Sequence, residues 1–509
     1  MSKILKKITM FVISILLLPV SIYAACSGSS PLLTTASCSV ADIQACITVA
    51  SAGDIINVPA GSCDWATTLN LNKSVKLVGA DPKKGTGTNI RQTAANGFIN
   101  IADGLDDWRI TGFTFLTDTS ADPRGNFNVI VATAGSFSSV RTNWRIDNNK
   151  FTGYHFAIYL MGIFSSTDVS SVIDNNTFYG GGIQFIGPGD VAWSEATSLG
   201  SKHFLFIENN AFHSLGALQT VQHFIASNNA ARVVVRYNQV YIDDTGTYKS
   251  SLGDLFDAHG NGHGSNIRGV RTYEIYKNEY IITQSPVPYL SEGVYLRGGT
   301  GVVWGNKFYS VMSRGGAIAL YDTRAAETGD TSTSAVCPAA CSSTARCTAV
   351  YYKVEVASDP FTIFTTNNGN GTIVTGASSG AVATINSMAR SGGNFLYFIS
   401  PPSVPFQNGE WLTVGGVQKI KTISVSSLVN GEGYPCCDQV GRGMNNNSEP
   451  AYFWDNVDEK GATATVYTSD PAYFVKDRDY IIAQKPGYTP YEHPHPLTKP
   501  QTPLLRKTN

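Results

Sequence analysis

One short phrase recurs along the middle of the chain and constrains its fold more than any other feature. Each copy is an alternating apolar run followed by Asn, any residue, and an apolar or aromatic residue, as in WRIDNNKF at 144–151. The asparagines that align in the six copies are Asn149, Asn176, Asn210, Asn238, Asn278 and Asn306. Neighbouring copies are separated by 27 residues at the least (149 to 176) and by 40 at the most (238 to 278). A repeat of this length, with one short strand per copy, predicts a solenoid of stacked coils.

The asparagines have a physical reason to recur. Asn tolerates the left-handed backbone that a tight turn needs, and its side-chain amide can hydrogen-bond to the Asn of the next coil. A β-sandwich with coincidental Asn turns is the alternative, but it should show hairpin signals every ~8–12 residues. The phrase recurs at roughly three times that interval. The sequence therefore predicts an all-β solenoid from which loops of unequal length leave the coil.

Composition agrees with this class of fold and limits the partners. The chain has 509 residues, of which 49 are Gly and only 15% are charged, with a net charge of −1. No basic stripe is visible, which argues against nucleic acid as a partner.

The first residues read as an export signal covering 1–24. Lys3, Lys6 and Lys7 precede an apolar core from Met10 to Val20, and Ser21–Ala25 supply small residues for cleavage. The apolar core is too short to span a membrane comfortably, so no transmembrane segment is expected after cleavage. The prediction is a secreted, periplasmic or cell-surface protein.

Nine cysteines, in an exported chain, predict disulfides whose pairing stays open. They are Cys26, Cys38, Cys46, Cys63, Cys337, Cys341, Cys347, Cys436 and Cys437. Two alternatives remain: lipidation of Cys26 after cleavage, and a metal knuckle at 337–347.

The start of the mature chain resembles a known family. ADIQACITVA (41–50) has apolar residues at helical spacing behind the plausible cap Ser39, and GDIINVPAG (53–61) and KSVKLVGA (73–80) follow as strands. This order is similar to the start of secreted right-handed parallel β-helix proteins of the pectate-lyase-like superfamily. The resemblance implies a right-handed parallel β-helix with an N-terminal helical cap over 25–350. It implies no activity, because many members are not enzymes.

Two later segments differ in character. Residues 351–425 have short strands and tight Gly turns without the Asn phrase, which predicts a small inserted β-module, with a long decorated loop as the alternative. This module resembles short SGA-containing modules of phage structural and surface proteins. Residues 426–509 should hold the final coils and a Pro-rich tail that runs extended along the outside.

Ionisable residues concentrate in 241–280, where the spacing of the phrase is longest. The candidate catalytic residues are Asp257, His259, His263, Arg268 and Arg271. Asp243, Asp244 and Asp254 could hold Ca²⁺ through hard oxygen ligands. Arg297, with Asp322 and Arg324, is the candidate substrate-binding set, because Arg297 follows Arg271 by about one coil and could form a basic ladder with it.

Two chemistries fit this set of residues, and so does a purely structural role without catalysis. β-Elimination from a uronate polymer needs a positive charge beside the sugar carboxylate and a nearby base. Residues 268–280 loosely resemble the pectate lyase pattern, by which Arg271 or Arg268 is the base. Hydrolysis needs an acid and a base carboxylate, and Asp243-Asp244 followed by Gly262-His263-Gly264 resembles the order of motifs in polygalacturonases.

The prediction is a protein that acts on or binds an extended, acidic polysaccharide or cell-surface glycan. A non-catalytic surface or adhesion protein, and a phage-derived depolymerase spike, are the alternatives. In the non-catalytic case the Asp and His residues cap turns in a Gly-rich loop.

Overall fold

A computed structural model describes the chain from residue 25 to residue 499, with internal gaps. The described residues are 25–81, 86–118, 120, 127–132, 141–161, 170–189, 196–214, 223–242, 254–260, 268–282, 292–308, 317–321, 352–369, 371–389, 393–398, 402, 404–427, 438–443, 448–468 and 474–499. No helix in these ranges is long and apolar enough to cross a membrane.

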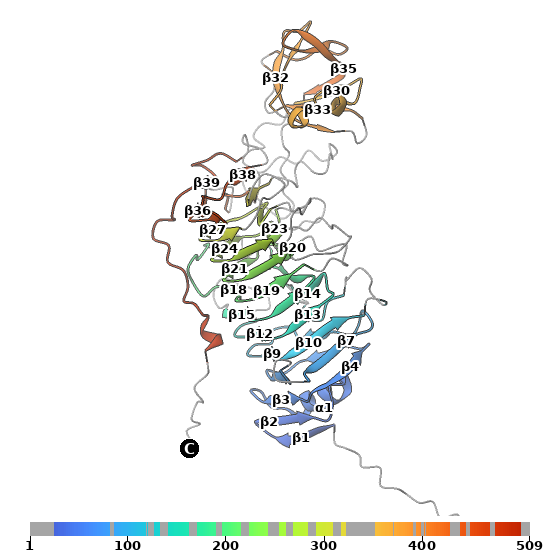
Figure 1. The fold of residues 1–509 in the computed structure, drawn as a ribbon, viewed down its shortest axis with the longest axis vertical. Helices are drawn as coiled ribbons and strands as arrows, with labels where there is room; N and C mark the ends of the chain where they lie inside the picture. The colour runs from blue at the N-terminus through green and yellow to red at the C-terminus, as the bar shows by residue number, and fades with distance from the viewer. Residues whose placement is uncertain are drawn as a thin grey trace, which may run out of the picture.

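Three sheets wind around one axis, and each coil gives one strand to each sheet (Figure 1). Sheet A contains β1 (Cys26–Ser29), β2 (Leu32–Thr35), β3 (Ile55–Val58), β6 (Lys76–Gly79), β9 (Arg109–Thr111), β12 (Arg145–Asp147), β15 (Ser170–Asp174), β18 (Phe204–Glu208), β21 (Arg232–Arg236), β24 (Thr272–Tyr276), β27 (Thr300–Trp304), β36 (Ala451–Trp454) and β39 (Tyr480–Ile481). Sheet B contains β4 (Gly61–Trp65), β7 (Thr88–Gln92), β10 (Phe113–Thr117), β13 (Lys150–Thr152), β16 (Thr177–Tyr179), β19 (Ala211–His213), β22 (Gln239–Ile242), β25 (Glu279–Ile282), β28 (Lys307–Phe308) and β37 (Val457–Asp458). Sheet C contains β5 (Leu69–Leu71), β8 (Ile99–Ile101), β11 (Ile130–Ala132), β14 (Phe156–Met161), β17 (Gly182–Ile186), β20 (His223–Asn228), β23 (Asp254–Ala258), β26 (Val294–Leu296), β29 (Ile318–Leu320) and β38 (Val466–Thr468).

Neighbouring strands of these sheets are parallel, apart from the antiparallel pair β1–β2 at the start. The predicted right-handed parallel β-helix is confirmed. Each Asn phrase covers the corner between sheets A and B, so it contributes to two strands, as β12 and β13 show, rather than to the one expected.

The asparagines form the predicted ladder at this corner. In each rung the backbone N–H and the side-chain Nδ2 donate to Oδ1 of the next Asn, as Asn149 does to Asn176 at 3.0 and 3.1 Å. The ladder continues without a break to a seventh rung, Asn456. One expectation was wrong: the left-handed residue is the one before the ladder Asn, for example Tyr237 with φ of 54°. The ladder Asn is required for the hydrogen bonds of its buried side-chain amide, and the residue before it supplies the left-handed backbone of the turn.

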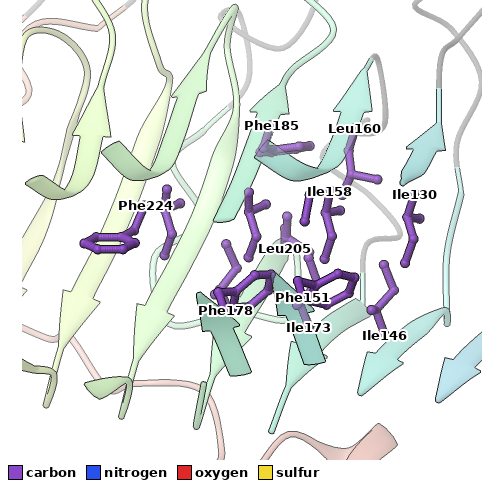
Figure 2. Packing of buried hydrophobic residues seen from close by; sticks show 14 of the residues in the cluster. Ile130, Ile146, Phe151, Ile158, Leu160, Ile173, Phe178, Phe185, Leu205 and Phe224 are labelled. Atoms are coloured by element: carbon purple, nitrogen blue, oxygen red, sulfur yellow. The ribbon is translucent and has the colours of Figure 1, made fainter. Parts of the chain in front are cut away.

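Stacked apolar side chains fill the interior (Figure 2). Phe151, Phe178 and Phe212 stack in successive coils of sheet B with ring centroids 4.9 and 4.8 Å apart. Ile146 and Ile173 repeat in the same way in sheet A. Because parallel strands in register place like residues above one another, each coil buries its apolar face only when its neighbours are present.

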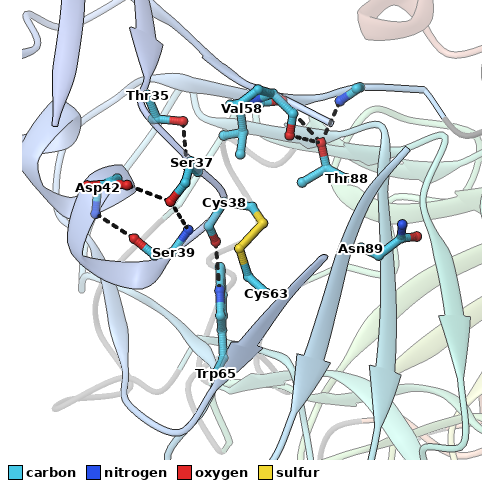
Figure 3. Close-up of a disulfide and its surroundings, with 12 residues drawn as sticks. Thr35, Ser37, Cys38, Ser39, Asp42, Val58, Cys63, Trp65, Thr88 and Asn89 are labelled. Carbon is cyan, nitrogen blue, oxygen red and sulfur yellow. Dashed lines mark hydrogen bonds between the residues drawn. A yellow bond between two sulfur atoms is a disulfide. The ribbon is translucent and has the colours of Figure 1, made fainter. Parts of the chain in front are cut away.

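The N-terminal cap of the solenoid matches its prediction. Helix α1 (Val40–Val49) begins at Ser39, whose side chain accepts from the N–H of Asp42. A disulfide joins Cys26 to Cys46. Figure 3 shows the second disulfide, between Cys38 and Cys63, and the hydrogen bond that Trp65 Nε1 donates to the carbonyl of Cys38. The bond to Cys46 engages the Cys26 sulfur, which contradicts lipidation there. The other five cysteines lie outside the described residues.

The inserted module is a closed antiparallel barrel. Its strands are β30 (Tyr352–Val356), β31 (Ile373–Gly376), β32 (Val382–Ala389), β33 (Phe395–Phe398), β34 (Trp411–Val414) and β35 (Val417–Ser427), with 3₁₀ turns η2 (Pro360–Thr362) and η3 (Thr366–Gly369). It has a separate core. After it the solenoid resumes, because β36, β37 and β38 pair directly with β27, β28 and β29.

Candidate functional site

The site lies on the outer face of sheet C, where β20, β23 and β26 run side by side. Ile225, Phe256 and Val294 are paired in register and fill the core. Because side chains alternate along a strand, their neighbours Asp257 and Tyr295 point away from the core. Asp257 is nevertheless fully buried, with an exposed fraction of 0%.

Three cationic or titratable side chains surround the Asp257 carboxylate. Arg297 donates from Nε to Oδ1 at 3.0 Å and from NH2 to Oδ2 at 2.5 Å. His259 Nε2 lies 2.9 Å from Oδ2, and His223 Nε2 lies 3.2 Å from the same oxygen. The side chains of His223, His259 and Arg297 are 16%, 17% and 8% exposed, so a ligand can reach them although it cannot reach Asp257.

A second carboxylate completes the cluster. His223 Nδ1 lies 2.9 Å from Oδ2 of Asp254, so this imidazole bridges Asp254 and Asp257. Burial raises the pKa of Asp254 to about 6, and the hydrogen bond and charge of His223 only partly oppose it. Burial acts in the same direction on Asp257, but the charges of Arg297, His259 and His223 outweigh it and hold the pKa of Asp257 well below its usual value.

The two imidazoles have different partners. His223 faces two carboxylates, and although burial lowers its pKa, Asp257 and Asp254 outweigh that effect and raise it. His259 has one carboxylate at Nε2 and the Arg297 Nη2 group 2.9 Å from Nδ1. A guanidinium can only donate, so Nδ1 of His259 is the acceptor in this contact. The cluster therefore places one imidazole between two carboxylates and the other between a carboxylate and a guanidinium.

The donor atoms also raise the question of a metal. His223, Asp257 and His259 offer three atoms within 4.8 Å of one another. Two imidazoles and a carboxylate suit a transition-metal ion better than Ca²⁺, which prefers a shell of oxygens. Arg297, however, already binds both oxygens of Asp257. Of the predicted Ca²⁺ ligands, Asp254 is bound to His223, and Asp243 and Asp244 lie outside the described residues.

Arg268 and Arg271 do not join this cluster, which corrects the expectation that either is the base. Both are buried. Arg268 binds the carboxylate of Asp438 at 2.6 Å, and Arg271 binds Glu449 at 2.7 Å. They hold the returning segments 438–443 and 448–450 against the coil.

The expected basic ladder of Arg271 and Arg297 is also wrong. The N–H of Arg297 donates to the carbonyl of Ala258, so Arg297 stacks one coil after Ala258 and His259. The carbonyl of Arg271 accepts from the N–H of Thr300, so Arg271 stacks beside Thr300 and not beside Arg297. Arg297 itself belongs to the cluster, through its two hydrogen bonds to Asp257. His263, Asp322 and Arg324 lie outside the described residues.

Sequence reasoning missed His223. It opens the apolar strand HFIASN at 223–228, and no polar motif surrounds it. The signal that identifies it is the register of sheet C, which pairs His223 with Asp254.

The three-sheet coil with its asparagine ladder is a parallel β-helix, so the fold that the resemblance implied is confirmed. The chain is similar in structure to a pectin methylesterase solved with a hexasaccharide, at 14% identity over 56% of this chain and 80% of that one, with a TM-score of 0.33. It is also similar to an alginate lyase from Paenibacillus, at 15% identity over 55% and 95% of the two chains, with a TM-score of 0.29. A third similar structure is the tailspike protein of E. coli bacteriophage HK620 in complex with a pentasaccharide (14% identity, 51% and 56% covered, TM-score 0.26). No family model matches the sequence, and neither does any curated protein.

Proposed function

We propose that this protein is exported and cleaves an extended acidic polysaccharide by β-elimination at the His223–Asp257–His259–Arg297 cluster. The observation that carries the proposal is the convergence of two partly exposed imidazoles and one guanidinium on a fully buried carboxylate. Such a site presents positive charge outward while its counter-charge stays inaccessible. A uronate carboxylate is the kind of group that this surface attracts.

Each residue then has a distinct role. Arg297, assisted by the charge of His223, neutralises the sugar carboxylate and makes the adjacent C–H more acidic. When Arg297 turns toward that carboxylate, it frees Nδ1 of His259, which removes the proton. The C–H electron pair forms the new C=C bond, and the glycosidic C–O bond breaks with its electron pair on the leaving oxygen. That oxygen takes the proton back from the His259 imidazolium, which returns the ring to its starting form. Asp257 positions His259 and stabilises the imidazolium that forms.

The test is the ultraviolet absorbance of unsaturated uronate products, followed with a panel of uronate polymers, with and without Ca²⁺. His259→Ala should lower turnover by roughly 10²–10⁴-fold, as the loss of a general base does. The matched control is His213→Ala, because His213 is also a partly buried imidazole on the outer face but lies in sheet B, stacked between Tyr179 and Tyr241. It should leave turnover unchanged, and both variants should keep the wild-type unfolding temperature. A flat trace with every polymer would refute elimination.

Hydrolysis is the second candidate, and one observation favours it. The environments of Asp254 and Asp257 move their pKa values apart, which is how a pair of carboxylates divides acid and base roles. New reducing ends without ultraviolet absorbance would identify this chemistry. Binding of a uronate polymer without either product would identify a non-catalytic glycan-binding protein. Two disulfides in the described residues fit an oxidising compartment, which supports export.

A further inference from the structure

The C-terminal strap, defined as residues 482–499, crosses the outer face of sheet A and runs back toward the N-terminal coils (Figure 1). Tyr488 contacts β24 through Glu274, Tyr491 packs on Phe206 of β18, and the carbonyl of Leu497 accepts from Arg145 of β12. The strap covers an apolar row of outward side chains. This row comprises Val172, Phe206, Val234 and Tyr276, against which Tyr491 and Leu497 pack.

His495 is the anchor of the distal end of the strap. Its ring is fully buried, and its backbone N–H donates to Glu208 Oε1 at 2.8 Å. Nδ1 accepts the N–H of Leu497 at 3.2 Å and so caps the short 3₁₀ turn η5 (Pro496–Thr498). Nε2 lies 3.0 Å from the hydroxyl of Ser170. Because Nδ1 must accept, the docked strap requires a neutral imidazole.

The surroundings of this ring also oppose a positive charge. Burial lowers the pKa of His495 from 6.5 to about 3, and two guanidiniums that face the ring, Arg236 of β21 and Arg145 of β12, add to this effect. The other ionisable groups packed here are Asp174 of β15, which binds Arg145, Glu208 of β18, which binds Arg236, and Tyr491 of the strap. The strap also carries His493, which stacks on Tyr237 and whose pKa is lowered to about 4 by burial and the charge of Arg236. Both carboxylates are already paired with arginines, so neither is left to compensate a charged ring.

The proximal contact responds to acid in the opposite sense. The hydroxyl of Tyr488 donates to Glu274 Oε2 at 2.5 Å, and the N–H of Gly200 donates to Oε1 at 2.6 Å. Burial raises the pKa of Glu274 from 4.5 to about 7. A carboxyl group whose pKa is raised stabilises the docked state below pH 4.5, and this stabilisation is lost as the pH rises through 7. A histidine whose pKa is lowered stabilises the docked state above pH 6.5, and this stabilisation is lost as the pH falls toward 3.

We propose that the strap is a pH-operated latch whose distal part, residues 491–499, detaches from sheet A on acidification while Tyr488 stays docked on Glu274. Detachment uncovers Phe206 and the neighbouring row and frees the backbone contacts of Arg145 and Arg236. The coils that the strap joins include the coil of β21, whose third strand, β23, carries Asp257. The latch stands on contacts of sheet A alone and does not depend on the proposed lyase activity.

Hydrogen exchange of the full chain tests the latch, after correction for the intrinsic effect of pH on exchange. In a His493→Asn background, which removes the strap's second histidine, protection of the amides of Leu497, Thr498 and Lys499 should fall roughly 30-fold between about pH 7.5 and about pH 5, the factor for releasing one histidine of pKa 6.5. Amides near Tyr488 and in β21 should keep their protection. His495→Asn is the matched variant, because an Asn side chain also caps a helical turn but does not titrate.

When His495→Asn is added to the His493→Asn background, protection of the same amides should be equal at the two pH values. Unchanged protection in the His493→Asn protein, or the same loss after His495→Asn is added, would overturn the proposal. If the double variant does not dock at neutral pH, the profile of the His493→Asn protein decides alone, because release by one proton changes protection about tenfold per pH unit below 6.5. A flatter profile, or simultaneous loss near Tyr488, would then refute the latch.

Discussion

Replacing Asn238 by Ala should break the asparagine ladder in its middle. Asn238 Oδ1 accepts from the backbone N–H of Asn210 at 2.9 Å and from its Nδ2 at 3.1 Å. Asn238 Nδ2 donates to the carbonyl of Ile207 at 2.9 Å and to Asn278 Oδ1 at 3.0 Å. All four bonds are lost in Asn238→Ala, and the backbone N–H of Asn210 stays buried without this acceptor, while Nδ2 of Asn210 keeps the carbonyls of Ile173 and Glu208.

The expected loss follows from these four bonds. At roughly 1 kcal/mol per hydrogen bond, with more for a donor left buried and unsatisfied, the variant should lose about 4 kcal/mol of unfolding free energy. The matched control is Gln239→Ala, one residue on, where an exposed side chain donates to Glu279 at 3.3 Å and accepts from the hydroxyl of Tyr241 at 2.8 Å. A surface change of this kind should stay within about 0.5 kcal/mol.

The assay must be local, because a long solenoid can open coil by coil rather than all at once. Hydrogen exchange in β18, β21 and β24 measures the free energy of opening on both sides of Asn238. Losses of similar size in Asn238→Ala and Gln239→Ala would refute the argument, since they would show that the buried amides do not stabilise the corner. A loss confined to the turn itself would show that the rungs are independent.

Two further outcomes follow from buried groups elsewhere in the solenoid. Glu274→Gln should stabilise the protein relative to wild type above pH 7 and have little effect below about pH 5, because the wild-type carboxyl, with a pKa raised to about 7, bears a buried charge only at the higher pH. Denaturant midpoints of the two proteins across this pH range measure the difference, and parallel pH profiles would contradict the prediction. Cys38→Ser with Cys63→Ser should destabilise the N-terminal cap by about 3 kcal/mol, since the disulfide closes a loop with a sequence separation of 25; exchange in α1 and β3 measures this, and unchanged exchange there would show that packing alone holds the cap.

The sequence predicted the solenoid because its strongest constraint is periodic and local. Each ladder Asn is followed by the same short pattern, and the intervals are too long for hairpins. The seventh rung was hidden because Asn456 follows Asn306 by 150 residues, with the barrel between them. The left-handed residue was misplaced because Asn148, Asn175 and Asn209 precede the ladder residues in the first three rungs, so two adjacent asparagines share the two tasks. Tyr237 and Lys277 show that the turn position accepts other residues, whereas the ladder position does not.

The candidate site was harder to predict because its members depend on register rather than on sequence neighbours. Asp257, His259 and Arg297 were selected for their types, and they meet. Arg268 and Arg271 have the same type and lie close by in the sequence, but their carboxylate partners are 170 and 178 residues away. No local sequence pattern predicts such distant partners. In the sequence alone, buried arginines that hold distant segments, such as Arg268 and Arg271, therefore cannot be distinguished from the partly exposed Arg297.

The stacking of the coils explains how one rung of sheet C can bury the Asp257 carboxylate within a cluster of charged groups. In most coils the outward side chains of sheet C are small or neutral, as Gln184 and Ala226 are in the two coils before Asp257. An isolated carboxylate at that position would be buried at a cost of several kcal/mol. His223 from the preceding coil and Arg297 from the following one supply the compensating charge, so three adjacent coils are needed to make one site. The same stacking that stabilises the core therefore also places His223 and Arg297 within hydrogen-bond distance of Asp257.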